Sequence, residues 1–185
     1  ETAGRYLKPV VLELGGKAPL VVFDDAELKE AVNAAAFGAF MNQGQICMST
    51  ERIILQGAIA DPFVKEFAAK ARSLPAGDPR GDVVLGAVIG EETIERVNEL
   101  IVDAVAKGAK HIVRGEAQGA VMGANVLDHV TPEMRIFHEE SFGPVVSIIR
   151  VRSDDEAIDV ANDTPYGLTS AVFSRDITRA MKAAK

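Results

Sequence analysis

Cys47 is the only cysteine in the sequence, and its surroundings favour a reactive thiol. The run at 42–46 (Asn-Gln-Gly-Gln-Ile) is rich in amides and glycine, so it makes a poor core segment and interrupts a helical pattern. It places the thiol in a polar, half-open loop, where nucleophilic cysteines are found. Because free cysteine is also among the most buried residue types, a structural thiol is the alternative.

Glu13 is a candidate general base, because it lies in the block Leu-Glu-Leu-Gly-Gly-Lys at 12–17, directly after a predicted strand. Burial there would raise the pKa of the carboxyl towards the range that a general base needs. The two glycines would let a ligand or a neighbouring strand approach the backbone closely. The alternative is an edge glutamate that points at solvent, and the local sequence by itself favours this alternative.

Two further blocks carry polar groups directly before predicted strands. The run at 137–144 sets the paired acids Glu139 and Glu140 beside Phe142 and ends in Gly-Pro. Such a run could bind a ribose and pack against a ring, or it could be a charged loop punctuated by Gly-Pro. The run at 162–168 (Asn-Asp-Thr-Pro-Tyr-Gly-Leu) reads first as a turn.

Strand-like and helix-like patterns alternate along the chain. Apolar runs bounded by Gly or Pro predict strands at 10–14, 20–23, 53–55, 112–113, 145–151 and 169–173. Helical spacing predicts helices at about 26–40 (capped by Asp24-Asp25), after Pro62, at 94–105, from a capping box at 153–156 and from Asp176. This alternation indicates an α/β fold with a mostly parallel sheet flanked by helices.

Composition excludes several classes of partner. The formal net charge is −7 and the basic residues are interleaved with acids, which argues against a nucleic-acid partner. No apolar run approaches the roughly 20 residues that span a bilayer. One cysteine and three scattered histidines form neither a disulfide nor a metal site, so we expect no metal and a cytoplasmic, reducing location.

Four collinear blocks together resemble the aldehyde dehydrogenase superfamily. They are Glu-Leu-Gly-Gly-Lys at 13–17, Asn-x-Gly-Gln-x-Cys at 42–47, Glu-Glu-x-Phe-Gly-Pro at 139–144 and Asn-x-x-x-Tyr-Gly-Leu at 162–168. The resemblance implies the catalytic-domain fold of that family. Residues 1–14 would then be the tail of a coenzyme-binding domain and its hinge, and residues 15–185 a C-terminally truncated catalytic domain.

The resemblance also implies roles for two residues. Cys47 matches the family nucleophile, whose thiolate attacks the aldehyde to give a thiohemiacetal and then a thioester. Its backbone N–H would be one donor to the oxyanion. Glu13 matches the general base that activates the hydrolytic water.

The implied cofactor is NAD or NADP. Glu140 matches the acid that holds the nicotinamide ribose, and Phe142 matches the aromatic residue beside that ring. The backbone of Leu14 would line the nicotinamide side. Lys17, Asn162 and Gly167 match recurrent positions that we interpret as structural.

The run at 45–52 resembles the branch of the family that acts on aromatic aldehydes such as salicylaldehyde, vanillin and benzaldehyde. Met41, Ile46 and Met48 offer an apolar, adaptable lining for a flat ring. Arg52 is the only nearby cation that could clamp a second carboxylate, unless it faces elsewhere. An aromatic aldehyde is therefore the expected substrate, and an aliphatic semialdehyde is the alternative.

A whole family member is far longer, so the chain reads as a fragment cut at both ends that we expect to be inactive alone. The full-length protein is expected to form a homodimer or homotetramer. Three other readings are a CoA-acylating or phosphorylating dehydrogenase, a non-catalytic scaffold that keeps the fold, and a flavodoxin-like binding domain. Retention of Glu13 argues against the first, since it favours water as the acyl acceptor, and retention of both Cys47 and Glu13 argues against the second. The absence of a glycine-rich phosphate loop argues against the third.

Overall fold

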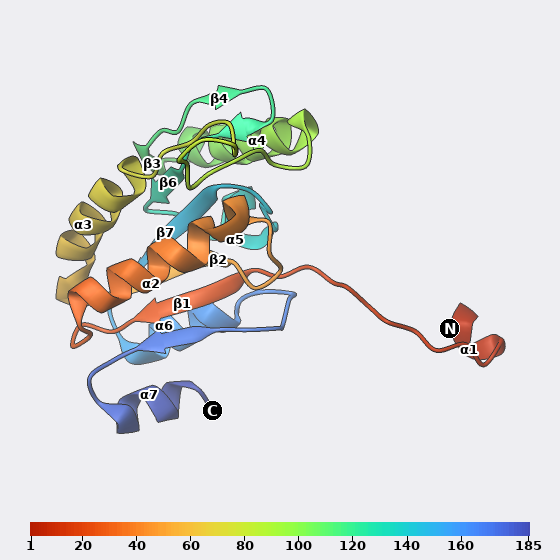
Figure 1. The fold of residues 1–185 in the computed structure, drawn as a ribbon. Coiled ribbons are helices and arrows are strands. Elements are labelled where there is room, and N and C mark those ends of the chain that lie inside the picture. Colours follow the sequence, from red (N-terminus) through yellow and green to blue (C-terminus); the bar gives the residue numbers. More distant parts are fainter.

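A six-stranded sheet runs through the computed structural model, which describes residues 1–185 (Figure 1). Its strand order is β3-β6-β7-β2-β1-β8, and every pair is parallel except β3 with β6. The predicted mostly parallel α/β architecture is therefore confirmed. The strands are β1 (Ala18–Val22), β2 (Thr50–Gln56), β3 (Lys110–Val113), β6 (Asn125–Asp128), β7 (Val145–Val151) and β8 (Ala171–Phe173), and a separate ribbon holds β4 (Ala117–Gln118) and β5 (Val121–Met122).

Helices cover both faces of the sheet because side chains alternate between the faces along each strand (Figure 1). In β1, Leu20 and Val22 join the core under α2 and α3, whereas Val21 joins the core on the opposite face. None of the helices has the length and apolarity that crossing a bilayer requires. The helical elements are α1 (Thr2–Arg5), α2 (Leu28–Phe40), η1 (Met41–Gly44), η2 (Gly57–Ile59), α3 (Ala60–Arg72), α4 (Glu91–Ala106), α5 (Arg135–His138), α6 (Asp154–Asn162) and α7 (Ile177–Ala183).

The predicted strand at 10–14 is wrong. These residues form an extended arm that leads away from the sheet to α1, with Val11 86% exposed and Leu12 70% exposed (Figure 1). The apolar, β-branched composition favours a strand, but a strand also needs a partner for its backbone groups. No strand within residues 1–185 pairs with this run, so its apolar side chains stay in solvent.

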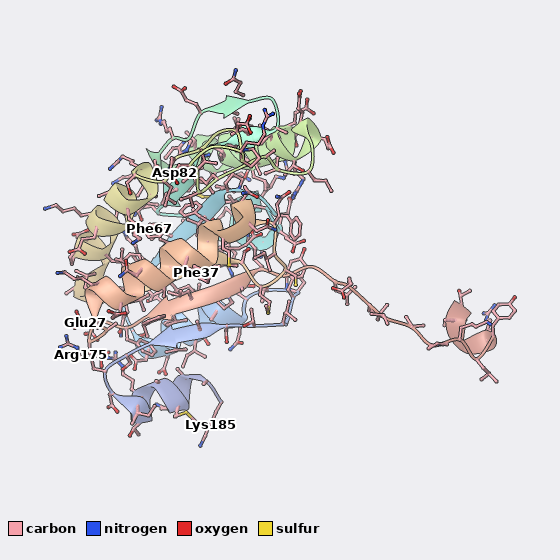
Figure 2. The ribbon with its side chains drawn as sticks, viewed as in Figure 1. Glu27, Phe37, Phe67, Asp82, Arg175 and Lys185 are labelled. Atoms are coloured by element: carbon pink, nitrogen blue, oxygen red, sulfur yellow. The ribbon has the colours of Figure 1, made fainter.

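The predicted helix at 26–40 is confirmed as α2, but its predicted cap is not. The N-cap position is Glu27, and its side chain makes no capping hydrogen bond. Asp25 instead accepts hydrogen bonds from Ser174 and from the backbone of Arg175, and Arg175 pairs with Glu27 (Figure 2). Asp25 and Glu27 therefore connect the start of α2 to the turn before α7. Local sequence cannot reveal this contact.

Two other predicted helix starts are confirmed. Ser153 accepts a hydrogen bond from the backbone N–H of Glu156 at the start of α6, and Asp176 accepts from Thr178 at the start of α7. The strand β6 was not predicted, because four residues followed by a turn give too few positions for a pattern.

Candidate active site

The four sequence blocks meet at one edge of the sheet because each directly precedes a parallel strand. The block at 13–17 leads into β1, the block at 42–47 into β2, the block at 139–144 into β7, and the block at 162–168 into β8. These strands are neighbours in the order β7-β2-β1-β8. Since parallel strands all begin at the same edge, segments more than a hundred residues apart lie side by side.

Cys47 lies in a loop that follows the abrupt end of helix α2. Asn42 and Gln43 adopt left-handed backbone conformations, with φ of 50° and 57°, so the helix cannot continue. A turn closed by the N–H of Ser49 on the carbonyl of Ile46 then surrounds Cys47. The cysteine is half-buried, and its backbone N–H donates to no group in the chain. It can therefore donate to a bound ligand.

One open hollow of about 470 Å³ brings all five predicted site residues together. The carboxylates come from the blocks before β1 and β7, and the thiol comes from the block before β2. Sequence reasoning missed one cation in this lining, Arg96 of α4, which donates from Nη1 to the backbone carbonyl of Glu140 at 2.6 Å. The lining residues are Glu13, Leu14, Gly15, Cys47, Arg96, Glu140 and Phe142.

Glu13 itself is exposed in this structure, so its carboxyl is not desolvated. It lies where the extended arm reaches the hollow, and Leu14 beside it is 71% exposed. Nothing within residues 1–185 covers this stretch, so water reaches the carboxylate. The solvent-facing alternative describes Glu13 as the chain stands.

Gly15 and Gly16 allow the first block to lie against the other two. The N–H of Gly16 donates to Oε1 of Glu140 at 2.8 Å. A Cβ atom at Gly15 would lie 2.7 Å from the carboxylate of Glu140, and one at Gly16 would lie 2.2 Å from the backbone carbonyl of Cys47. No side chain fits at Gly16 without moving the cysteine.

We expect Gly16→Ala to displace Cys47 and to lower any activity of the full-length protein that depends on this thiol by about a hundredfold, as misplacement of a reacting group by about 1 Å can. The measurement is the steady-state rate of that activity, accompanied by the rate at which iodoacetamide alkylates Cys47. Gly167→Ala is the matched control, because a Cβ atom there meets nothing within 4 Å. Equal activity in both variants would contradict the close packing at Gly16.

A buried ion pair lies beneath the hollow. Lys17 Nζ donates to Oε2 of Glu51 at 2.6 Å, and their side chains are 0% and 6% exposed. Burial lowers the pKa of the Lys17 ammonium, and the neighbouring Glu51 carboxylate opposes that change. The pair joins the block before β1 to the start of strand β2. Sequence reasoning gave Glu51 no role, although a charged residue at the head of an apolar strand needs a partner.

Arg52 is fully buried and faces away from the hollow. Its guanidinium donates to the backbone carbonyls of Lys17, Val160, Ala161 and Asp163 at 2.9–3.2 Å. All its acceptors belong to the protein backbone, so it cannot clamp a carboxylate of a substrate.

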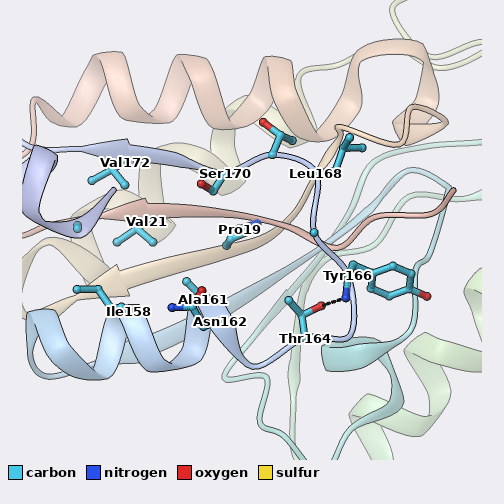
Figure 3. A pocket seen from close by; sticks show the side chains of 13 residues that line it. Pro19, Val21, Ile158, Ala161, Asn162, Thr164, Tyr166, Leu168, Ser170 and Val172 are labelled. Atoms are coloured by element: carbon cyan, nitrogen blue, oxygen red, sulfur yellow. Dashed lines mark hydrogen bonds between the residues drawn. The ribbon is translucent and has the colours of Figure 1, made fainter. Parts of the chain in front are cut away.

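The block before β8 lines a second hollow of about 520 Å³ between α6, β1 and β8 (Figure 3). Its walls combine polar residues with apolar ones such as Val21, Ile158 and Val172. Tyr166 and Leu168 also reach a narrow cleft of about 20 Å³ that Cys47 lines from the other side. This block therefore lies beside Cys47, and the hollow of about 470 Å³ is lined by residues of the other three blocks and by Arg96.

The chain matches the model of the aldehyde dehydrogenase family over residues 1–185. It is 53% identical over 186 residues to a vanillin dehydrogenase of Pseudomonas sp. (strain HR199 / DSM 7063), covering all of this chain and 38% of that protein. A crystal structure of a salicylaldehyde dehydrogenase from Pseudomonas putida G7 complexed with salicylaldehyde superposes with a TM-score of 0.93 at 52% identity, covering 98% of this chain and 38% of that one.

A crystal structure of an NAD-dependent benzaldehyde dehydrogenase from Corynebacterium glutamicum gives a TM-score of 0.90 at 38% identity, covering 99% of this chain and 42% of that one. The chain thus spans about two fifths of the length of these relatives. A match along the whole sequence, with four blocks gathered at one edge of the same sheet, leads to one conclusion: residues 1–185 belong to the aldehyde dehydrogenase family.

Proposed function

We propose that residues 1–185 are the catalytic part of an NAD(P)-dependent aldehyde dehydrogenase, with residues 1–14 as its hinge to a coenzyme-binding domain. The observation that carries the proposal is the shared hollow, in which Cys47, Glu13 and Glu140 come from three separate segments. The full-length protein would act as a cytoplasmic homodimer or homotetramer.

Cys47 is the nucleophile of this proposal. Its thiolate adds to the aldehyde carbon and forms a C–S bond, while the carbonyl oxygen becomes an oxyanion. The free N–H of Cys47 is placed to donate to that oxygen. The coenzyme, when bound, would supply the hydride acceptor, and loss of hydride from the thiohemiacetal would leave a thioester on the sulfur of Cys47.

Glu13 is the base that the thioester requires. It accepts a proton from water, whose oxygen attacks the acyl carbon, so that the carboxylic acid leaves and the Cys47 thiolate is restored. The exposed carboxylate lies at the rim of the same hollow as the thiol and is open to water. Retention of Glu13 favours water as the acyl acceptor over CoA or phosphate.

The hollow fits the ribose and ring of a nicotinamide coenzyme. Glu140 is half-buried, and only its Oε1 is engaged, by Gly16. Its Oε2 accepts from no group in the chain and is therefore open to a ribose hydroxyl. Phe142 supplies an aromatic wall beside it, and the backbone of Leu14 completes that side. These three residues would hold the coenzyme.

An aromatic aldehyde is the proposed substrate. Met41 and Met48 are 49% and 58% exposed and flank Cys47 in sequence, with the half-buried Ile46 between them. These apolar, flexible side chains suit a flat ring. The burial of Arg52 supports the choice over a semialdehyde that carries a second carboxylate, because that side chain is not available to bind one. Arg96, the cation in the lining of the hollow, already donates to the backbone carbonyl of Glu140.

The proposal is tested by trapping the acyl enzyme. Full-length protein with Glu13→Gln, mixed with NAD⁺ and benzaldehyde or vanillin, should accumulate an acyl adduct on Cys47 that intact-mass spectrometry detects. Steady-state turnover should fall by about a hundredfold, since a general base contributes at least that much.

The native protein should release the acid and show no lasting adduct. Aliphatic semialdehydes run in parallel would report the substrate class. Absence of any adduct in the Glu13 variant with every aldehyde, despite bound coenzyme, would overturn the proposed function.

A further inference from the structure

Glu51 is a buried carboxylate that the chemistry of Cys47 and Glu13 does not use. It is 5% exposed and lies in β2, four residues after the cysteine. Besides the Lys17 ammonium, it accepts from three groups on one loop. The N–H of Ser141 donates to both oxygens at 3.0 and 2.8 Å, the Ser141 hydroxyl donates at 2.8 Å, and the N–H of Phe142 donates at 3.0 Å.

The loop that Glu51 holds cannot keep its shape by local preference. Phe142 has a φ of 46°, in the left-handed region that a bulky aromatic residue rarely adopts. Such a conformation persists only where surrounding contacts enforce it. The Glu51 carboxylate is the acceptor for the N–H of Phe142 itself, and it also fixes the preceding N–H of Ser141.

The same carboxylate joins the two segments that flank the coenzyme side of the hollow. Through Lys17 it holds the block before β1, and through Ser141 and Phe142 it holds the block before β7. Glu140 then reaches back from the second block to the N–H of Gly16 in the first. Glu140 and Phe142 are thus the two neighbours in sequence of Ser141, which is hydrogen-bonded to Glu51.

We infer that Glu51 is a positioning residue for coenzyme binding: it fixes the loop at 140–142 so that Glu140 and Phe142 face the hollow together. The inference rests on the proposed function. It differs from a purely stabilising ion pair, because a stabilising pair would affect unfolding without affecting coenzyme affinity.

Glu51→Gln in the full-length protein tests this role. The amide keeps one acceptor oxygen but turns N–H groups towards the Lys17 ammonium or the Ser141 N–H, so donor faces donor. Calorimetric titration with NADH and NADPH should show about tenfold weaker binding, the size expected when charge-assisted hydrogen bonds are lost. KM for the coenzyme should rise in parallel, with KM for the aldehyde unchanged.

A second readout needs no coenzyme. Hydrogen exchange followed by mass spectrometry should be faster at 139–143 in Glu51→Gln, since two N–H groups there lose a charged acceptor. Exchange within β7 at 145–151 should stay at the native rate. A merely structural role would raise exchange across the domain or leave the loop unchanged.

Two further variants separate positioning from folding. The double variant Lys17→Met with Glu51→Gln removes the ammonium that Glu51→Gln alone would leave unpaired, so it should recover stability and still bind the coenzyme weakly. Asp128→Asn is the matched control: this carboxylate is 3% exposed and binds Arg150 at the opposite edge of the sheet. It should lower stability and keep native coenzyme affinity.

Each outcome points to one conclusion. Native protein that binds neither coenzyme would overturn the proposed function and this inference with it. Native binding in both Glu51 variants, with unchanged exchange at 139–143, would overturn the inference alone. Equal weakening in Asp128→Asn would show that any buried carboxylate has this effect, and would overturn it too.

Discussion

Replacing Cys47 with alanine should abolish aldehyde oxidation by the full-length protein and leave coenzyme binding intact. We expect kcat/KM to fall by about 10⁴-fold or more, because loss of the nucleophile removes the covalent step altogether. The measurement is NAD(P)H formation at 340 nm with an aromatic aldehyde, together with calorimetric titration of the coenzyme. The backbone N–H of residue 47 survives in the variant, so any residual rate reports what the oxyanion donor contributes without the thiol.

Ser49→Ala is the matched control for this experiment. Ser49 lies two residues from Cys47 and is 4% exposed, and its hydroxyl makes no hydrogen bond in the chain. Its removal should therefore change kcat/KM by less than about twofold. If Cys47→Ala retained a tenth of the native rate, the thiol would be structural and the nucleophile would have to be sought elsewhere in the hollow.

The position of the site at the amino edge of the strands has a physical consequence. In many open parallel sheets the ligand lies at the carboxyl ends of the strands, where loops lead into helices. Here the chemical groups lie on segments that enter β1, β2 and β7, so each group is only a few residues from a buried strand. Strand packing then fixes the thiol and Glu140, whereas Glu13, on the arm, lacks such support.

The features that local sequence predicted correctly are those that depend only on residues close together in the chain. The buried strand β7, the serine cap at Ser153 and the end of helical conformation after α2 follow from composition and spacing, and the structure shows all three. The predicted capping box is only half formed, because the Glu156 carboxylate accepts from the N–H of Arg152 and not from that of Ser153. The co-location of Cys47 with Glu140 follows once the blocks are assigned to neighbouring parallel strands. That assignment came from the family resemblance, because no local pattern gives the order β7-β2-β1-β8.

Other features depend on partners distant in sequence. The run at 10–14 has the composition of a strand but finds no neighbour to pair with. Asp25 is a residue type that often caps helices, but its carboxylate accepts hydrogen bonds from Ser174 and Arg175 instead. Glu51 and Arg52 are adjacent charges whose burial is only intelligible once their acceptors and donors, up to 111 residues away, are known.

Arg52 provides the largest expected effect on stability. It donates four hydrogen bonds to backbone carbonyls, three of them at the end of α6. Arg52→Met keeps the apolar stem but leaves four carbonyls without this donor, one of them buried and three part-buried. We expect a loss of about 3–5 kcal/mol in the free energy of unfolding, because several acceptors lose their partner together. Differential scanning calorimetry should show the unfolding midpoint of this domain lowered by about 10 °C.

Arg152→Met distinguishes this effect from the loss of any arginine. Arg152 lies just after β7 with its side chain 93% exposed, and its contact with Glu156 is a surface ion pair at 3.5 Å. Such a pair contributes at most about 1 kcal/mol, so the midpoint should hardly change. Because Arg52 anchors the chain that runs from α6 to Tyr166, its loss should also loosen the cleft beside Cys47. Equal midpoints in the two variants would mean that water replaces the guanidinium at the end of α6, and that the buried arginine is dispensable to the fold.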